Sequence, residues 1–412
     1  MSTPLQDQPI SPSTAAPPHH AETRAVRAGI ATDPVHGAVV PPLFLSSNYT
    51  FESFGNKRTY DYARSGNPTR ALLEDTLAEL EGGAGGVCVA SGMAAATLVA
   101  LWLGPNRRVL AQHDIYGGCH RLFCSLRDRG LLEVEFIDFC NPSAWRSAVD
   151  RGAALVWLET PSNPLLRVVD VAAIAERAHA AGAKVAVDNT FLSPALQRPI
   201  ELGADIVVHS TTKSINGHSD VVGGAVVAKS KADAASLDWW CNCLGLSQSP
   251  GDCAQISRGL RTLHARWRAH EENARAVADL LARHPAVDRV HYPGLTSSPY
   301  HELATRQQDG YGCIVSFELK APPGGDVTDE VQRLTEELRL FSLAESLGGV
   351  ESLVAHPATM THLSMTPEAR REAGIGEGLL RLSVGIEAQR DLLDDLQRAL
   401  DSLSIRFAAA AE

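Results

Sequence analysis

The feature that most constrains this chain is an alternation of short apolar runs and amphipathic stretches along residues 70–209. The apolar runs predict buried strands, and apolar residues at helical spacing predict the helices between them. Repeated strand–helix–strand units form a mostly parallel sheet covered by helices on both faces, so we predict an α/β fold. The predicted strands are residues 87–90, 108–111, 132–137, 154–159, 184–188 and 206–209. The predicted helices are residues 70–81, 94–103, 122–129 and 171–181.

The chain length indicates more than one domain, because 412 residues exceed the size of a single compact core. Another strand is predicted at 221–228, followed by a long helical stretch at 261–283 and a smaller α+β region with strands near 314–319 and 379–384. Residues 1–22 are rich in Pro, Ser and Thr, which predicts a disordered tail. The predicted organisation is this tail, a loop-rich arm contacting a neighbouring subunit (23–64), a sheet domain (65–270) and a C-terminal domain (271–412).

Composition excludes several classes of protein. The net charge of −11 and the lack of any Lys/Arg run argue against a nucleic-acid partner. No apolar stretch reaches the ~18 residues of a membrane span, and the N-terminus lacks the features of a secretory signal, so we expect no membrane partner and a cytoplasmic location. The eight cysteines are too few for a disulfide scaffold in a chain this long, and reduced thiols are expected. No His/Cys cluster has metal-ligand spacing, so no metal is predicted.

The segment 204–220 (ADIVVHSTTKSINGHSD) carries one lysine, Lys213, directly after a predicted strand. Only six of the 37 Lys and Arg residues are lysines, and Ser210 and Thr212 precede this one by three residues and one residue. A lysine that can lose its proton beside phosphate-binding hydroxyls is what a pyridoxal-phosphate Schiff base needs. Asp188, at the end of a neighbouring strand, could keep the ring nitrogen of that cofactor protonated. Two ordinary strand ends would also explain this pair of residues.

Other candidate residues also follow predicted strands, where ligands bind in open α/β sheets. Ser91-Gly92-Met93 joins a strand to a helix, and free backbone N–H groups at such a start attract phosphate. The ring of Tyr116 could stack on a pyridine, and the side chain of Asn163 could donate a hydrogen bond to the cofactor. Each of these residues could equally be part of a turn or of the core.

The motifs DNTFLSPAL (from Asp188), HSTTKSINGHSDVVGG (around Lys213) and D-x-Y-G-G (around Tyr116) resemble those of the trans-sulfuration family of fold-type-I pyridoxal-phosphate enzymes. The resemblance covers residues 23–403, nearly the whole chain apart from its tails. It implies the fold-type-I architecture, with a mostly parallel sheet in a large domain and a smaller C-terminal α+β domain. It also implies pyridoxal 5′-phosphate as the cofactor.

The resemblance also implies roles for individual residues. Lys213 would hold the cofactor and act as the catalytic base, with Tyr116 as a stacking group and candidate acid or base. Ser91, Gly92, Met93, Ser210 and Thr212 match the residues that bind the cofactor phosphate, while Asp188 and Asn163 match those that contact its ring. Tyr62 and Arg64 match a pair that reaches the phosphate of a neighbouring subunit, which implies a homotetramer of active-site-sharing dimers.

The substrate residues implied by the family come mainly from the C-terminal region. Arg381 matches the arginine that binds the α-carboxylate, and Glu345 and Ser346 lie in the matching substrate loop. Arg121 is either a contact to the distal part of the substrate or a surface arginine at the start of a helix. His356 and His362 flank the loop and are interpreted as structural.

The branch of the family is indicated by other segments. VDNTFLSPALQRP, the pair Trp239–Trp240 and AESLGGVESLVAHPATMTH resemble cystathionine γ-synthases, whereas Ser65, Cys243 and Ser214 depart from that pattern. We therefore predict γ-replacement of O-succinyl- or O-acetylhomoserine by cysteine, giving cystathionine for methionine biosynthesis. The alternative is a cystathionine γ-lyase, which releases cysteine, 2-oxobutanoate and ammonia.

Two other classes of protein fit the sequence less well. A dinucleotide-binding oxidoreductase needs G-x-G-x-x-G after its first strand, but here the glycines at 82–86 precede that strand. A catalytically inactive scaffold is disfavoured because Lys213, Asp188, Tyr116 and Arg381 are all present.

Overall fold

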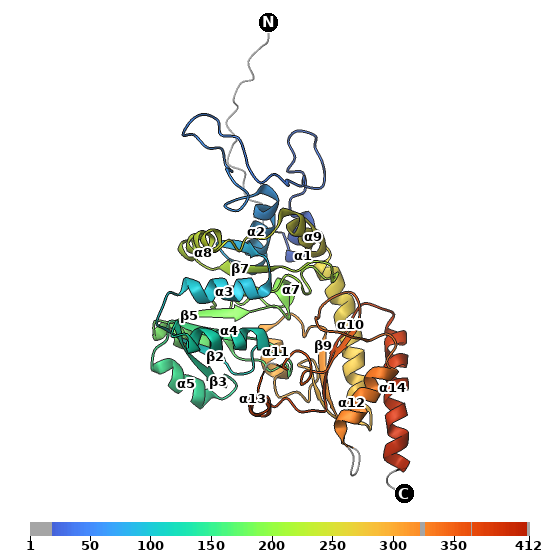
Figure 1. Cartoon of the computed structure of the whole chain (residues 1–412). Coiled ribbons are helices and arrows are strands. Elements are labelled where there is room, and N and C mark those ends of the chain that lie inside the picture. The colour runs from blue at the N-terminus through green and yellow to red at the C-terminus, as the bar shows by residue number, and fades with distance from the viewer. Residues whose placement is uncertain (1–18, 322–325, 364, 410–412) are drawn as a thin grey trace.

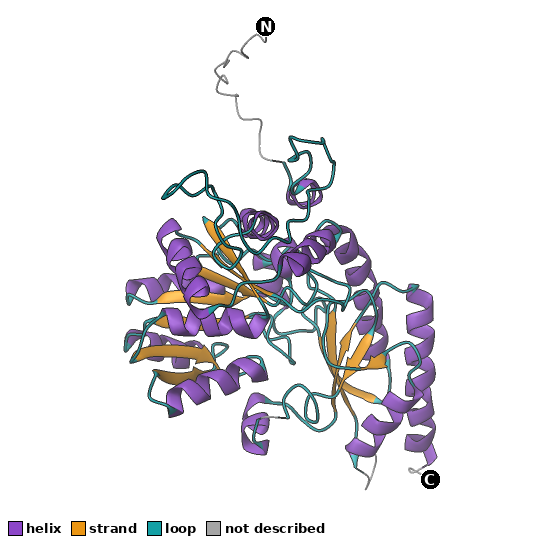
Figure 2. Cartoon of the chain, turned by 45° about the horizontal axis from the view of Figure 1, so that its top comes forward, coloured by secondary structure: helices purple, strands orange, loops and turns teal. Residues whose placement is uncertain are grey.

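The computed structural model describes residues 19–321, 326–363 and 365–409, which form two sheets flanked by helices (Figures 1 and 2). The larger sheet has seven strands in the order β1-β7-β6-β5-β4-β2-β3. Strands β2 to β6 are parallel to one another, and only β7 is antiparallel to its neighbours, β1 and β6. The predicted mostly parallel sheet is therefore confirmed. Its strands are β1 (Gly85–Val89), β2 (Arg107–Gln112), β3 (Leu132–Ile137), β4 (Leu155–Glu159), β5 (Lys184–Asp188), β6 (Ile206–His209) and β7 (Gly224–Ala228).

Helices cover both faces of this sheet. Successive side chains of a strand point to opposite faces, and in these strands the side chains on both faces are apolar. In β5, Ala186 packs on the face covered by α3, α4 and α8, whereas Val185 and Val187 pack on the face covered by α5 and α6. The helices α2, α7 and α9 continue that second face beneath β6 and β7. Their bounds are α2 (Pro68–Glu81), α3 (Gly92–Trp102), α4 (Gly117–Asp128), α5 (Pro142–Asp150), α6 (Val171–Ala180), α7 (Ser193–Leu196), α8 (Lys231–Leu244) and α9 (Pro250–Leu260).

Local sequence signals set the ends of α2. The Asn67 side chain accepts hydrogen bonds from the backbone N–H of Thr69 (2.9 Å) and Arg70 (3.2 Å), and Pro68 occupies the first helical position. Gly82 ends the helix in the left-handed conformation (φ 75°), which glycine adopts without steric cost. The helix therefore begins two residues before the predicted start and ends where predicted.

The second sheet has the strand order β10-β11-β12-β9-β8 and follows α10 (Leu263–Arg283) in sequence. This helix packs into both cores, because Trp267 belongs to a cluster under the large sheet while Val277 and Leu281 join the cluster of the second sheet. The predicted boundary at residue 270 falls inside it. The strands are β8 (Val287–His291), β9 (Ile314–Leu319), β10 (Ser342–Leu343), β11 (Leu353–Ala355) and β12 (Leu379–Ser383), and the helices are α11 (His301–Gln307), α12 (Val327–Glu337), α13 (Pro367–Ala373) and α14 (Gln389–Ala409).

The N-terminal segment projects from the body as loops, at the top of Figure 1. Most of the predicted tail, residues 1–18, lies outside the described residues, but Ala21 and Glu22 are helical because α1 spans Ala21–Arg27. From residue 28 to 67 the chain has no helix and exposes many apolar side chains. These are Val35, Val39, Val40, Leu43, Phe44, Leu45, Phe51 and Phe54. Among the residues that the structure describes, no helix is both long and apolar enough to cross a membrane.

We expect the packing of α3 on the sheet to contribute strongly to stability. Leu98 on α3 is fully buried, so Leu98→Ala leaves a cavity and is expected to lower the free energy of unfolding by about 2–5 kcal/mol. Leu131 is 42% exposed, and Leu131→Ala is the matched control, with an expected change below about 0.5 kcal/mol. Urea unfolding followed by circular dichroism measures both variants. Equal losses would contradict this assignment of the core.

Candidate active site

A cavity of about 330 Å³ opens at the carboxyl ends of β4, β5 and β6, next to the start of α3. All the predicted site residues line it except Tyr62, Arg64 and Arg121. Its lining comprises Ser91, Gly92, Met93, Tyr116, Cys119, Glu159, Asn163, Asp188, Thr190, Phe191, Ser210, Thr212, Lys213, Val222, Glu345, Ser346, Leu347, Thr361 and Arg381. The structure thus brings together residues from both sheets that lie as far apart in sequence as Ser91 and Arg381.

Lys213 lies in the turn after β6 and extends its amine toward the C-terminal region. The Nζ atom donates a hydrogen bond to Ser346 Oγ at 2.9 Å. Burial, and secondly the positive charge of Arg381, lower the pKa of Lys213 to about 8, against a smaller opposite effect of Glu345. A substantial fraction of this amine is therefore neutral near physiological pH, as a nucleophile or base requires.

Asp188, the last residue of β5, has one carboxylate oxygen fixed by Thr190. Oδ1 accepts hydrogen bonds from the backbone N–H (3.0 Å) and the hydroxyl (2.5 Å) of Thr190. Burial raises the pKa of Asp188, and the bonds from Thr190 and the nearby His209 oppose that rise. A cationic ring nitrogen would compensate for the burial of this carboxylate, so the residue fits the pyridine of pyridoxal phosphate.

Near Asp188 lies a buried pair of side chains, His209 and Glu81, that was not predicted from the sequence. His209 Nε2 is 2.6 Å from Glu81 Oε1, and neither side chain is exposed to solvent. His209 lies at the end of β6, and Glu81 is the last residue of α2. The pair joins the sheet to the helix beneath it.

The start of α3 forms a cradle suited to a phosphate group. Ser91 Oγ accepts a hydrogen bond from the backbone N–H of Ala94 (3.0 Å), while first-turn N–H groups of a helix have no intrahelical acceptor. Gly92 packs so closely on Ser210 that a Cβ at this position would lie 2.7 Å from the Cβ of Ser210. The Ser210 side chain lines the cavity beside this glycine. Free donors around a closely packed glycine fit the phosphate of the cofactor.

Thr212 differs from Ser210 in how its hydroxyl is used. It donates a hydrogen bond to the carbonyl of Gly223 (3.1 Å) and accepts one from the backbone N–H of the same residue (2.9 Å). Its side chain lines the cavity, but in this structure it ties the turn after β6 to the segment before β7.

Arg381 in β12 is 2% exposed and faces the cavity from the second sheet. Nη1 donates to Asn163 Oδ1 at 2.9 Å, and Nη2 donates to the backbone carbonyl of Ser346 at 2.8 Å. The Nε atom is buried without a hydrogen-bond partner among the described residues. Burial lowers the pKa of Arg381 to about 10, with Glu345 the largest opposing influence. A buried guanidinium with an unused donor favours an anionic ligand such as a carboxylate.

Tyr116 precedes α4 and lines the cavity with its ring. Its backbone N–H donates to Glu159 Oε2 at 2.7 Å. The ring lies so near Gly118 that a Cβ there would come within 2.5 Å of it, so only glycine leaves room for the ring. Burial raises the pKa of the Tyr116 phenol, which therefore stays protonated near neutral pH.

Three predicted residues lie outside the cavity of the single chain. Arg121 is exposed on α4, and Tyr62 is 50% exposed in the N-terminal segment. Arg64 donates to the backbone carbonyl (2.8 Å) and the side-chain oxygen (2.6 Å) of Asn242, near the end of α8. The prediction that Tyr62 and Arg64 reach the site of a neighbouring subunit therefore stays a prediction.

Several cavity residues were missed by the sequence analysis. Thr190 and Glu159 could have been predicted from the sequence. Thr190 lies two residues after Asp188, and Glu159 ends a predicted strand four residues before Asn163. Phe191, Val222 and Leu347 carried none, since an apolar residue in a loop resembles any other. The remaining two are Cys119 and Thr361.

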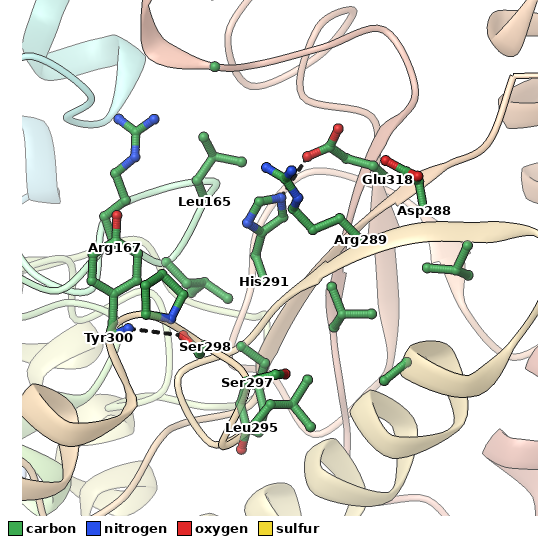
Figure 3. A pocket seen from close by; sticks show the side chains of 17 residues that line it. Leu165, Arg167, Asp288, Arg289, His291, Leu295, Ser297, Ser298, Tyr300 and Glu318 are labelled. Atoms are coloured by element: carbon green, nitrogen blue, oxygen red, sulfur yellow. Dashed lines mark hydrogen bonds and ion pairs between the residues drawn. The ribbon is translucent and has the colours of Figure 1, made fainter.

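A second, larger cavity of about 550 Å³ lies between the segment 165–167 and the strand β8 (Figure 3). Figure 3 shows His291 beside Glu318, joined by a contact of 2.8 Å, and Tyr300 with Ser298 at the opposite wall. None of the predicted site residues lines this cavity.

The fold and the first cavity together define a pyridoxal-phosphate-dependent enzyme of fold type I. The family model for the Cys/Met metabolism PLP-dependent enzymes matches residues 22–401, and the chain belongs to this family. The cofactor and the fold predicted from the motifs are thereby confirmed.

Curated relatives span several activities. The chain is 50% identical over 376 residues to a cystathionine gamma-synthase of Escherichia coli (strain K12), covering 91% of this chain and 96% of the relative. It is 44% identical over 380 residues to a cystathionine gamma-lyase of Dictyostelium discoideum, covering 92% and 97%. A crystal structure of a cystathionine gamma synthase from Xanthomonas oryzae pv. oryzae in complex with cystathionine is 54% identical, with a TM-score of 0.91, and the match covers 96% of this chain and 100% of that one.

The pKa of Lys213 leads to a pH prediction. Because only the neutral amine attacks an aldehyde, the rate at which the apoprotein takes up pyridoxal phosphate should rise with pH, with a midpoint at about 8. Arg381→Leu removes a neighbouring cation, which raises the pKa of Lys213 and moves the midpoint to higher pH. Visible absorbance after rapid mixing measures the rate. Arg390→Leu, at a largely exposed position, is the control, and an unmoved midpoint in Arg381→Leu would refute the electrostatic coupling.

Proposed function

We propose that this chain is a cystathionine γ-synthase, which replaces the acyloxy group of an O-acylated homoserine by the thiol of cysteine. The observation that carries the proposal is the identity to two synthases over nearly the whole chain, 50% and 54%, against 44% for a γ-lyase. The proposed substrates are O-succinyl- or O-acetylhomoserine and L-cysteine, and the proposed role is methionine biosynthesis in the cytoplasm. The eight cysteines, none of which forms a disulfide in the described part of the chain, support that location.

Some of the site residues bind the cofactor or the substrate, and Lys213 transfers protons. Ser91, Gly92, Met93 and Ser210 hold the cofactor phosphate, and Asp188 holds a proton on the ring nitrogen. Arg381 binds the α-carboxylate of the substrate, which orients its Cα toward the cavity. Lys213 Nζ then takes the proton from Cα, which its lowered pKa of about 8 permits.

The cofactor, when bound, stabilises negative charge at the substrate carbons. In the overall replacement, the bond between Cγ and the acyl oxygen breaks, the Cγ–S bond forms, and the thiol proton is lost as the carboxylate departs. We assign the return of protons to Lys213 as well, because its amine lies in the cavity and contacts Ser346, a predicted substrate residue. Tyr116 covers the ring, and its protonated phenol can donate a proton.

A γ-lyase activity is the second candidate. Ser65 supports it, because the RSGNPT segment is closer to the lyases than to a synthase type with a second arginine there. In that reaction the Cγ–S bond of cystathionine breaks, one water molecule is consumed, and cysteine, 2-oxobutanoate and ammonia are released. The same lysine, aspartate and arginine would serve it.

Two separate incubations at equal enzyme concentration distinguish the two activities. We expect O-succinylhomoserine or O-acetylhomoserine with cysteine to give cystathionine faster than cystathionine gives 2-oxobutanoate, as measured by chromatography and by a keto-acid assay. Lys213→Ala is the control and should abolish both reactions. Faster 2-oxobutanoate release by the unchanged protein would reassign it as a lyase.

We also propose a homotetramer of dimers in which Tyr62 and Arg64 complete the cofactor site of a neighbouring subunit. The exposed apolar side chains of residues 35–54 support this assembly, because burying them against a second copy removes apolar surface from water. The half-exposed Tyr62 and the cation of Arg64 suit a phosphate that enters from another chain.

Mixing two inactive variants tests the shared site. Lys213→Ala retains Arg64, and Arg64→Ala retains Lys213, so a mixed dimer has one complete site. Unfolding and refolding the two together should restore about a quarter of the wild-type activity, because half of the dimers are mixed and each has one of two sites intact. Refolding each variant alone is the control. No recovery in the mixture, with mixed dimers demonstrated by two affinity tags, would exclude sharing.

A further inference from the structure

Glu159 is an acid of the cavity wall that is not among the predicted site residues. It is the last residue of β4 and lies opposite Asp188 in the ladder between β4 and β5. Neighbouring residues of a parallel pair point to the same face, so both acids lie on the face from which α3 and α4 begin. Asp188 is engaged by Thr190, whereas Glu159 has different partners.

Both oxygens of Glu159 are used by backbone donors from two separate segments. Oε2 accepts the N–H of Tyr116 at 2.7 Å, and Oε1 accepts the N–H of Asn163 at 3.0 Å. The side chain is 4% exposed, and burial together with the charge of Asp188 raises its pKa. A buried carboxylate beside a second acid is costly to keep, and its two N–H donors offset part of that cost.

Through Asn163, the same carboxylate is connected to the substrate-binding side of the cavity. The side chain of Asn163 accepts from Arg381 (2.9 Å), Arg381 donates to the carbonyl of Ser346 (2.8 Å), and the Ser346 hydroxyl accepts from Lys213 (2.9 Å). These hydrogen bonds, joined through the covalent structures of Asn163, Arg381 and Ser346, connect the backbone of Tyr116 with the amine of Lys213. Glu159 connects Tyr116 to the other members through Asn163.

Further hydrogen bonds hold the backbone of Glu159 and the segment before Asn163. Gln112 Oε1 accepts from the N–H of Glu159 at 3.3 Å, and its amide nitrogen donates to Asp114 at 2.8 Å. The other oxygen of Asp114 accepts from the hydroxyl of Ser162 at 2.6 Å, next to Asn163. Hydrogen bonds therefore hold Glu159 in place between the segments that contain Tyr116 and Asn163.

We propose that Glu159 is a positioning residue that sets Tyr116, which covers the cofactor ring, and Arg381, which binds the substrate carboxylate, relative to each other. The inference rests on the cofactor and on the proposed role of Arg381. It does not depend on whether the chain acts as a synthase or a lyase, because both reactions need the ring covered and the carboxylate held.

The test compares Glu159→Gln with Glu330→Gln. Glu330 is equally buried, 4% exposed, but lies on α12, away from the cavity. The amide introduced by Glu159→Gln would offer one acceptor oxygen to two N–H groups, so exchange of the Tyr116 and Asn163 amide protons in the apoprotein should accelerate by about tenfold or more. Hydrogen-exchange mass spectrometry of the peptides that contain these residues measures it, and Glu330→Gln should leave both peptides unchanged.

In the loaded enzyme the same variant should weaken the visible circular dichroism of the bound cofactor, which reports how the ring is held. The KM for the amino-acid substrate should rise through Arg381, and kcat/KM should fall by roughly tenfold to a hundredfold. Glu330→Gln should alter only thermal stability. Wild-type exchange, dichroism and KM in Glu159→Gln would overturn the proposal. If Glu159→Gln does not fold, Glu159→Asp decides, because its shorter carboxylate cannot span both donors: wild-type dichroism and KM in that variant would also overturn it.

Discussion

The site depends on one buried amine that must lose its proton easily. Lys213 and Arg381 are cations enclosed in the same cavity, and burial with this repulsion brings the pKa of the amine to about 8. Burial makes the larger contribution and Arg381 the second, and the two residues come from different domains, Lys213 from the turn after β6 and Arg381 from β12. The large domain supplies the amine and Asp188, and the small domain supplies the guanidinium and Ser346. The contact between the two domains at this cavity is therefore a condition of the chemistry.

The parallel sheet explains why the polar residues of the large domain converge. Strands β4, β5 and β6 end at the same edge, so Glu159, Asp188 and Lys213 meet there although each follows a different helix. The helix α3 begins at this edge with Ser91 and Gly92 and directs its unpaired N–H groups at the place where an anion is needed. The positions of the acids, the amine and the anion site therefore follow from one rule, that ligands bind at the carboxyl ends of the strands in an open α/β sheet.

Much of the fold and of the site could be predicted from the sequence. The strands at 184–188 and 206–209 were placed correctly because fully buried parallel strands read as continuous apolar runs. The strand predicted at 221–228 begins at Gly224, since its first three residues form a loop that brings Val222 to the cavity. Partners such as Glu81 of His209 could not be foreseen, because a contact between residues 128 positions apart leaves no local pattern.

The helix α10 passes without interruption from one core to the other, with Trp267 in the first and Leu281 in the second. The helix therefore connects the two cores as one uninterrupted element. The segment between β10 and β11 adds a second connection at the cavity, because Leu347 packs in the core cluster under the large sheet and the backbone N–H of Gly348 donates to Ser383 Oγ of β12 at 2.8 Å. A change in that segment therefore acts on the packing of both domains as well as on Glu345 and Ser346, which line the cavity.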